Sequence, residues 1–423
     1  MKRCGLWLLV VANCLSALWG QEQAHTVRFT HGNWFDGVAF HLQTWYSVNG
    51  FLRSKGPSTV DETIDLKGKF VVPACGEAHN HSATGDHPEA IDSFLAQGTL
   101  YVENPANLPR IRTGERINTP DGVDVIFSNG VLTAPGGHPL ALVQRNIERG
   151  AMTPEDGEGG FYYTIATPAD LDQKWPMLLA TKPDFIKTIL AYSEEFEQRK
   201  ADPKYFSRRG LDPKLLPLIV QKANASGLWV AAHIWSAADF HVAVSAGVHQ
   251  IAHMPGFWPS EEAIADTNFE NRNFERYRIS EADARLAGKK HIQVTTTLGE
   301  GLQLTRDPKS KDFGNALLDV HKNNLLLLRK NKVEILIGSD QFFSNSQGEA
   351  LALVRSGLMS AQEALHAWCE VTPQAIFPSR KIGKIKDGYE ANLMVLSSDP
   401  LTDFTAVKDV KMTIKRGVEI KVP

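Results

Sequence analysis

The stretch GKFVVPACGEAHNH, residues 68–81, joins a short apolar run to two histidines separated by one residue. The run Phe70–Cys75 is almost continuously apolar, as expected of a strand covered on both faces. On an extended backbone His79 and His81 point to the same side, because side-chain direction repeats every two residues. Such a pair can hold a metal ion, although in a chain with 14 histidines it can also arise by chance. We therefore interpret this stretch as a buried strand that leads into a candidate metal site.

Seven further apolar runs follow and alternate with helix-like segments, which is typical of βα units around a parallel sheet. The runs are Thr99–Glu103, Val123–Phe127, Asp184–Ile189, Leu228–His233, Val248–His253, Ile292–Thr297 and Val333–Gly338. Eight such strands predict the α/β class, with a (β/α)8 TIM barrel over residues 69–380. The links over about 134–182 and 255–290 are long, so we expect them to overhang the carboxyl ends of the strands.

Both ends of the chain have a different pattern, in which aromatic and β-branched residues are interrupted by glycines. Residues 21–68 resemble short strands separated by turns, and residues 381–423 do so as well, with Asp387-Gly388 and Arg416-Gly417 as turn signals. We predict that the two segments together form a small β-sandwich domain.

Residues 1–20 have the layout of a secretory signal peptide. Lys2 and Arg3 precede the apolar run Gly5–Leu18, and Gly20 offers a small residue for cleavage. The run is shorter than the roughly 20 apolar residues of a membrane-spanning helix, so we predict no transmembrane anchor. We expect a periplasmic or secreted protein that retains only Cys75 and Cys369, both free and buried, although one disulfide is an alternative in an exported chain.

The formal net charge of −3, without a basic block, argues against nucleic acid as a partner. A small-molecule substrate is compatible with it, and the sequence leaves a homo-oligomer open.

Residues that can bind a metal or change protonation stand at the ends of five predicted strands. They are His79 with His81, Lys187, His233, His253 and Asp340. Each has an ordinary explanation by itself: a hydrogen-bonded core histidine, a solvated rim lysine or an aspartate that caps a helix. However, barrel active sites are built from the carboxyl ends of several strands, and an unpaired buried charge is costly. The combination therefore predicts one shared site.

This arrangement resembles the amidohydrolase superfamily in its binuclear form. That family has His-x-His after the first strand, lysine on the fourth, histidine on the fifth and sixth, and aspartate on the eighth. Ile382–Asn392 resembles the family's return into its satellite β-domain, and Thr133–His138 is similar to a loop of the prolidase-like and imidazolonepropionase-like branches. The chain departs from the pattern at Glu77, where many members have aspartate, and at Ala74-Cys75, where Gly-Leu is more usual.

The resemblance implies two divalent metal ions, for which zinc suits the imidazole ligands best. The implied ligands are His79, His81, Lys187, His233, His253 and Asp340. It further implies that Lys187 is carboxylated by CO2. The charges agree, because a carbamate, Asp340 and a bridging hydroxide nearly balance two divalent cations, whereas an ammonium would leave a surplus.

For the reaction, we expect a metal-bridging hydroxide, available near neutral pH, to attack a polarised carbonyl. Asp340 is the candidate general base, which takes the proton of the attacking water and passes it to the leaving nitrogen. Tyr192 resembles the tyrosine that steadies the oxyanion in the hydantoinase branch, and packing against a lid is its alternative. His138 is a candidate substrate-binding residue or a turn cap.

We expect an amidohydrolase that cleaves a carbon–nitrogen bond in an amide, such as a dipeptide or an N-acyl amino acid. An esterase, lactonase or carbamate hydrolase on the same binuclear centre is the second hypothesis. A deaminase or cyclic-amidine hydrolase is third, because those relatives usually use one metal and lack the lysine that matches Lys187. A non-catalytic binding protein would have a damaged ligand set, whereas all six positions are intact.

Overall fold

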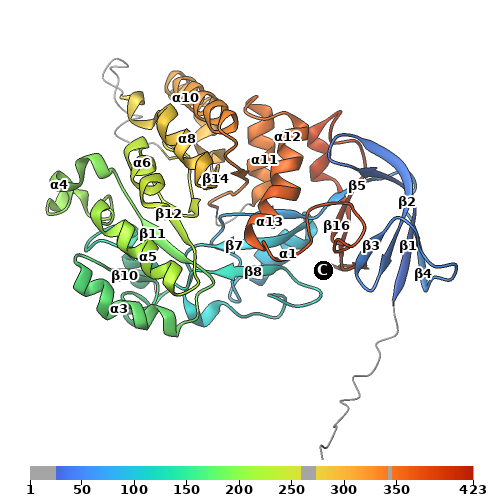
Figure 1. Cartoon of the computed structure of the whole chain (residues 1–423), viewed down its shortest axis with the longest axis horizontal. Coiled ribbons are helices and arrows are strands. Elements are labelled where there is room, and N and C mark those ends of the chain that lie inside the picture. The colour runs from blue at the N-terminus through green and yellow to red at the C-terminus, as the bar shows by residue number, and fades with distance from the viewer. Residues whose placement is uncertain (1–24, 259–272, 342–344, 423) are drawn as a thin grey trace, which may run out of the picture.

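The computed structural model describes residues 25–258, 273–341 and 345–422. The predicted signal peptide and part of the link after the sixth predicted strand lie outside these residues. The described chain is an α/β protein with two parallel sheets on one side and a mixed sheet on the other (Figure 1). None of its described helices combines the length and apolarity needed to cross a membrane.

The two parallel sheets supply the strands predicted for the barrel. The larger sheet has the order β10 (Tyr162–Thr164), β9 (Val131–Thr133), β11 (Ile186–Ile189), β12 (Val230–His233), β13 (Gln250–Ile251), β14 (Gln293–Thr295) and β15 (Ile335–Leu336). The smaller sheet has the order β6 (Cys75–Glu77), β7 (Thr99–Asn104) and β8 (Asp124–Phe127). The strands β9 and β10, which come from the long third link, were not predicted.

Backbone hydrogen bonds connect the two sheets at two places. Beyond β6, the Ala78 amide donates to the Ile337 carbonyl at 2.9 Å, and the Asp340 amide donates to the His79 carbonyl at 2.7 Å. On the other side, the Asp184 amide donates to the Phe127 carbonyl at 2.8 Å. The arrangement is of the TIM-barrel type, with the carboxyl ends of its strands gathered at one mouth.

Helices follow most of these strands and cover the sheets (Figure 1). In chain order they are α1 (Pro88–Ala96), α2 (Leu140–Glu148), α3 (Pro168–Ala180), α4 (Phe196–Arg199), α5 (Leu216–Ala225), α6 (Ala237–Ala246), α8 (Glu281–Lys289), α9 (Gly299–Gln303), α10 (Lys311–Lys330), α11 (Ser346–Arg355), α12 (Ala361–His366) and α13 (Thr372–Ile376). The helix α6 illustrates how the sequence sets such boundaries. The side chain of Ser236 accepts from the Asp239 amide in a capping box, and Gly247 ends the helix at φ 78°. The strand β12 can therefore end at His233, just before the helix begins.

A mixed sheet of eight strands forms the satellite domain. It runs β18 (Val418–Glu419), β17 (Val410–Lys415), β16 (Leu393–Leu396), β5 (Phe70–Pro73), β1 (Thr26–Phe35), β2 (Phe40–Val48) and β3 (Phe51–Arg53), and β4 (Glu62–Asp65) pairs with β1. Both termini therefore contribute to it. The hydrogen bonds join the strands into one mixed sheet, in which β1 is parallel to β4 and β5, and the predicted β-sandwich arrangement stays a prediction.

The first predicted run, Phe70–Cys75, is divided between the two domains. Its residues Phe70–Pro73 form β5, which pairs with β16 and β1 in the satellite sheet, whereas Cys75 begins the barrel strand β6. The predicted domain boundary after Gly68 is therefore too early, and the chain enters the barrel after Pro73. A strand in the satellite sheet and a strand in the barrel can have the same apolar composition. The two parts of this run are therefore distinguished by the strands with which they pair.

A network of largely buried ion pairs, in which Arg380 keeps 22% of its side chain exposed, lies where the satellite meets the amino ends of the barrel strands; we call it the junction network. Arg380 donates to both carboxylate oxygens of Glu390, at 2.9 and 2.6 Å, and to Asp124 at 2.7 Å. Lys415 donates to Asp124 at 2.6 Å and to two backbone carbonyls at 2.7 Å. Its charged groups are thus matched with partners of opposite sign.

Candidate metal centre

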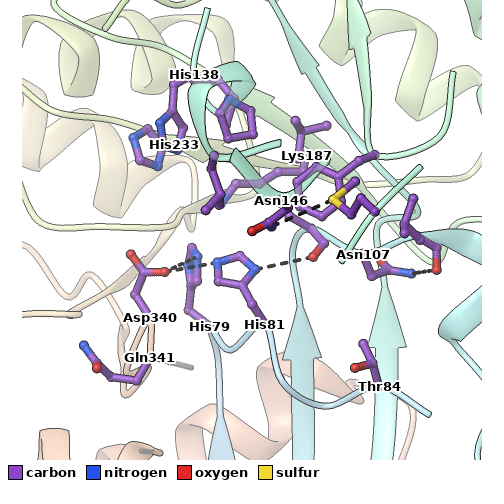
Figure 2. A pocket seen from close by; sticks show the side chains of 18 of the residues that line it. His79, His81, Thr84, Asn107, His138, Asn146, Lys187, His233, Asp340 and Gln341 are labelled. Carbon is purple, nitrogen blue, oxygen red and sulfur yellow. Dashed lines mark hydrogen bonds and ion pairs between the residues drawn. The ribbon is translucent and has the colours of Figure 1, made fainter. Parts of the chain in front are cut away.

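His79 and His81 follow β6 and approach Asp340, which lies beyond β15. From Asp340 Oδ1, Nε2 of His81 is 3.1 Å away and Nε2 of His79 is 3.5 Å away (Figure 2). One donor atom from each of the three residues lies within 4.8 Å of the others, so they can hold one metal ion. Asp340 has φ 53°, a conformation that is uncommon outside glycine and that often marks functional sites.

His233 and His253 extend this cluster on the other side. The ring centroids of His79 and His253 are 4.4 Å apart, and those of His253 and His233 are 4.5 Å apart. Lys187 is the second residue of β11 and is 3% exposed. All six predicted ligand residues line one cavity of about 680 Å³ at the carboxyl ends of the strands. Convergence of the scattered residues, on which the sequence interpretation depended, is therefore confirmed.

Four buried nitrogen atoms of the predicted ligand residues have no hydrogen-bond partner among the described residues. They are Nδ1 of His79, Nε2 of His233, Nε2 of His253 and Nζ of Lys187. A buried polar atom without a partner costs about 1–3 kcal/mol, and native structures contain few of them. Several such atoms around one carboxylate are what a metal centre without its ions would leave. The residues present therefore fit a centre for divalent cations.

The partners of the other ring nitrogens orient the histidines. His253 Nδ1 lies 2.8 Å from the hydroxyl of Thr297, and His81 Nδ1 lies 3.4 Å from the carbonyl of Ala106. Contacts of this kind fix the tautomer and the ring direction of metal-binding histidines. Burial lowers the pKa of His79, His233 and His253 well below the usual value, which favours the neutral imidazole that binds metals.

Burial also disfavours the charged form of Lys187, lowering its pKa to about 8, while Asp340 and Glu103 oppose the shift. Sequence analysis missed Glu103, which ends the predicted run Thr99–Glu103. It is 1% exposed, its Oε1 has no partner among the described residues, and burial raises its pKa to about 8. The only signal was a carboxylate in an otherwise apolar strand.

Glu77 holds the two ligand-bearing segments together. Its carboxylate accepts from the backbone amides of His79 at 3.0 Å and Ser339 at 2.9 Å, and from the hydroxyl of Ser339 at 2.7 Å. These bonds fix the backbone on either side of the pair formed by His79 and Asp340. At this position the departure from the family's aspartate keeps a carboxylate in place.

His138, predicted to bind substrate, lines the cavity. Its ring stacks on that of His233 with centroids 4.9 Å apart, and burial lowers its pKa to about 4. Its carbonyl also accepts a hydrogen bond from the Thr133 hydroxyl at 2.6 Å, which shapes the turn. The position thus suits both of the roles considered for this residue.

Tyr192, predicted to steady the oxyanion, is not among the residues that line the cavity. The guanidinium carbons of Arg199 and Arg276 lie 4.0 and 4.5 Å from the centre of its ring. Its ring also stacks on Trp235, with centroids 5.9 Å apart, and Trp235 does line the cavity. The arrangement therefore gives the predicted oxyanion role no support and agrees with the packing alternative.

The two long links supply much of the cavity wall, as predicted. Leu142, Met152 and Phe161 come from the third link, and Phe257 and Trp258 come from the sixth. Arg110 also lines the cavity, but its Nε and Nη2 donate to the carboxylate of Asp156, each at 2.9 Å. The wall is thus mainly apolar around a metal-binding floor.

Comparisons with known proteins agree with this geometry. Residues 174–420 match the amidohydrolase family. No match is found among curated proteins. Similar solved structures include a prolidase complexed with N-methylphosphonate-L-proline, at 18% identity and a TM-score of 0.68 over 94% of this chain and 100% of the other. The ochratoxinase of A. niger is 17% identical with a TM-score of 0.69, over 95% of this chain and 96% of the other. A molinate hydrolase is 16% identical with a TM-score of 0.67, over 94% of this chain and 95% of the other. At these identities the likeness establishes a shared fold.

Proposed function

This chain belongs to the amidohydrolase family, and from that premise we propose that it is an exported binuclear enzyme that hydrolyses a small amide, such as an N-acyl amino acid or a dipeptide. The observation that carries the proposal is the set of four unpartnered buried nitrogens on predicted ligand residues that line one cavity with Asp340. Hydrolysis of carbon–nitrogen bonds is the activity of the family.

We assign the ligands of two divalent cations, preferably zinc, to the two sides of this cluster. His79, His81 and Asp340 serve one ion, and His233 and His253 serve the other. When bound, the ions polarise a carbonyl and lower the pKa of water. Lys187 would complete the centre as a carbamate, formed when its uncharged amine bonds to the carbon of CO2 and one proton is released. The unpartnered Nζ supports this assignment, because a lysine that served the fold alone would need a partner.

Asp340 is suited to move a proton during the reaction. Its Oδ1 faces His79 and His81, whereas its Oδ2 lies 3.9 Å from His253, and the side chain is 27% exposed toward the cavity. The carboxylate can accept a proton from the attacking water and return it to the leaving nitrogen. An amine leaves poorly unless it is protonated, so an amide needs this transfer more than an ester does.

The wall formed by Leu142, Met152 and Phe161 favours an apolar acyl or side-chain group on the substrate. An ester or lactone would use the same floor and is the second hypothesis. The third, a deaminase or cyclic-amidine hydrolase, is disfavoured by the position of Lys187 in the floor.

The proposal is tested with the full-length protein after zinc has been restored. Dipeptides, N-acyl amino acids and esters with the same acyl groups are compared by kcat/KM, and metal content is measured by elemental analysis. We expect two metal ions per chain and amide turnover that a chelator abolishes.

Two variants of one βα unit provide the control. His233→Ala should lose metal and activity, whereas His241→Ala, an exposed histidine on α6 that pairs with Asp283, should keep both. Turnover of esters alone would replace the amide assignment with the second hypothesis. One metal ion or none would refute the binuclear centre. Sequencing the amino terminus of the exported protein tests the cleavage of residues 1–20.

A further inference from the structure

Two cysteines that are far apart in sequence meet in the core. Cys75 is the first residue of β6, and Cys369 lies in the short helical segment Ala367–Val371 that precedes α13. Their sulfur atoms are 2.7 Å apart although the residues are separated by 294 positions. Both side chains are buried, with exposed fractions of 0% and 2%, and among the described residues they are the free cysteines. Two thiols in direct contact and shielded from solvent are placed to react with each other and with little else.

We propose that Cys75 and Cys369 form a structural disulfide in the mature protein. The bonded sulfur atoms of a disulfide are about 2.05 Å apart, so small side-chain rotations suffice to close the remaining distance. From the sequence we expected two free cysteines, with a disulfide as the alternative. Contact between the two sulfur atoms favours the disulfide. It is independent of the proposed hydrolase activity.

The bond requires an oxidant, and a disulfide of a thiol–disulfide oxidoreductase or of a small thiol provides it. One cysteine thiolate attacks that disulfide to give a mixed disulfide, and the second displaces the remaining thiol. One sulfur–sulfur bond forms in this chain and one breaks in the oxidant, whose two sulfurs leave as thiols carrying the two protons. Such oxidants act in the compartments to which the predicted signal peptide would direct the chain.

Burial determines when the bond can form. Because it raises the pKa of the Cys75 thiol well above its usual range, the reactive thiolate is disfavoured once the core has closed. The bond therefore forms while the chain folds, and afterwards it resists reductants that cannot enter the core. This behaviour is that of a structural disulfide rather than of a redox switch.

The bond would connect β6 to the helical region around Cys369, which also contacts the end of β15. A Cβ at Gly76 would lie only 2.7 Å from the Thr372 methyl, so β6 packs directly against this segment. Thr372 Oγ1 accepts a hydrogen bond from the Ile337 amide at 2.9 Å, just beyond β15. The strand β6 leads to His79 and β15 leads to Asp340. A cross-link at Cys75 thus secures the base from which these two ligands extend.

The experiment uses the full chain produced with its own amino-terminal segment in an oxidising compartment. The protein is denatured with a thiol-blocking reagent, with or without prior reduction, and analysed by peptide mapping. We expect a cross-linked peptide pair containing Cys75 and Cys369, with both residues blocked only after reduction. Mapping separates these residues from Cys4 and Cys14. Blocking of Cys75 and Cys369 without reductant would overturn the proposal.

Variants test the structural role. In Cys75→Ala or Cys369→Ala, the remaining cysteine should be blocked without reductant. The double variant Cys75→Ala/Cys369→Ala should fold and should melt about 5–10 °C below the oxidised protein, because a long loop is no longer closed in the unfolded chain. Reductant added during unfolding should lower the melting temperature of the wild-type protein but not that of the double variant. Equal melting temperatures for oxidised and reduced wild-type protein would refute a structural disulfide.

Discussion

The metal centre and the junction network lie at opposite ends of the barrel strands, and they treat buried charge in opposite ways. In the junction network, Arg380 and Lys415 face the carboxylates of Asp124 and Glu390 at 2.6–2.9 Å. In the metal centre, Lys187 and three histidines leave a buried nitrogen without a partner among the described residues. The junction network joins two domains, whereas the metal centre has buried nitrogen atoms that are available to a ligand. The two regions therefore differ in whether their basic side chains have partners of opposite charge.

The largest effect should come from Asp340→Asn. The amide keeps the shape of the side chain but accepts no proton at neutral pH, so turnover should fall by about 10⁴-fold while metal remains bound. Steady-state kinetics with elemental analysis check this result. The matched change Asp124→Asn in the junction network should lower the melting temperature and leave kcat nearly unchanged. Unaltered turnover in Asp340→Asn would remove its proton-transfer role.

Lys187→Ala should have the next largest effect, a loss of about 10³-fold in kcat/KM together with metal, because the variant lacks the proposed carbamate ligand. Short carboxylic acids should restore part of the activity, since they can occupy the place of the carbamate. Lys415→Ala is the control in the junction network, and its activity should not respond to these acids. Full activity of Lys187→Ala without any acid would exclude the carbamate.

Arg380→Met should reverse the pattern seen in the metal centre. It removes the cation that binds both oxygens of Glu390, while Arg416 stays 3.7 Å from Glu390 and Lys415 stays on Asp124, so the free energy of unfolding should fall by about 2 kcal/mol. Turnover per folded molecule should stay within about twofold. Denaturant unfolding measures the first effect and kinetics the second. Arg285→Met, which removes an exposed pair with Glu281 at 3.8 Å, should change stability by less than about 0.5 kcal/mol. Equal effects of the two variants would show that burial does not distinguish these pairs.

The smallest effect should come from a surface pair near the junction. His366 Nδ1 lies 3.2 Å from Glu370, and this hydrogen bond raises the pKa of the histidine above its usual 6.5. Its contribution to stability is thus fully present below about pH 6.5 and disappears as the pH rises through the raised value. Because His366 is half exposed, we expect only about 0.5 kcal/mol or less. Urea unfolding at pH 6 and pH 8 should show a larger loss in His366→Gln at pH 6. A larger loss at pH 8 would contradict this linkage.

Most of the candidate ligand residues could be found from sequence because they stand at or just beyond the end of an apolar run. The carboxyl ends of parallel strands meet at one end of the sheet, so His79, His233 and Asp340 could be grouped from the sequence alone. Glu103 also ends an apolar run, but a single carboxylate carries no signal until its surroundings are known. Tyr192 was misleading for the opposite reason, since its spacing from Lys187 fits a site residue while Arg199 and Arg276 enclose its ring.

The sequence by itself determined the α/β class, most of the parallel strands and the set of candidate metal-binding side chains, because these depend on local periodicity and residue chemistry. The tertiary structure decided which polar atoms have partners, that Phe70–Pro73 joins the satellite sheet, and that Cys75 meets Cys369. Those facts depend on contacts between residues hundreds of positions apart, and such contacts are fixed by packing of the whole chain and by no local pattern.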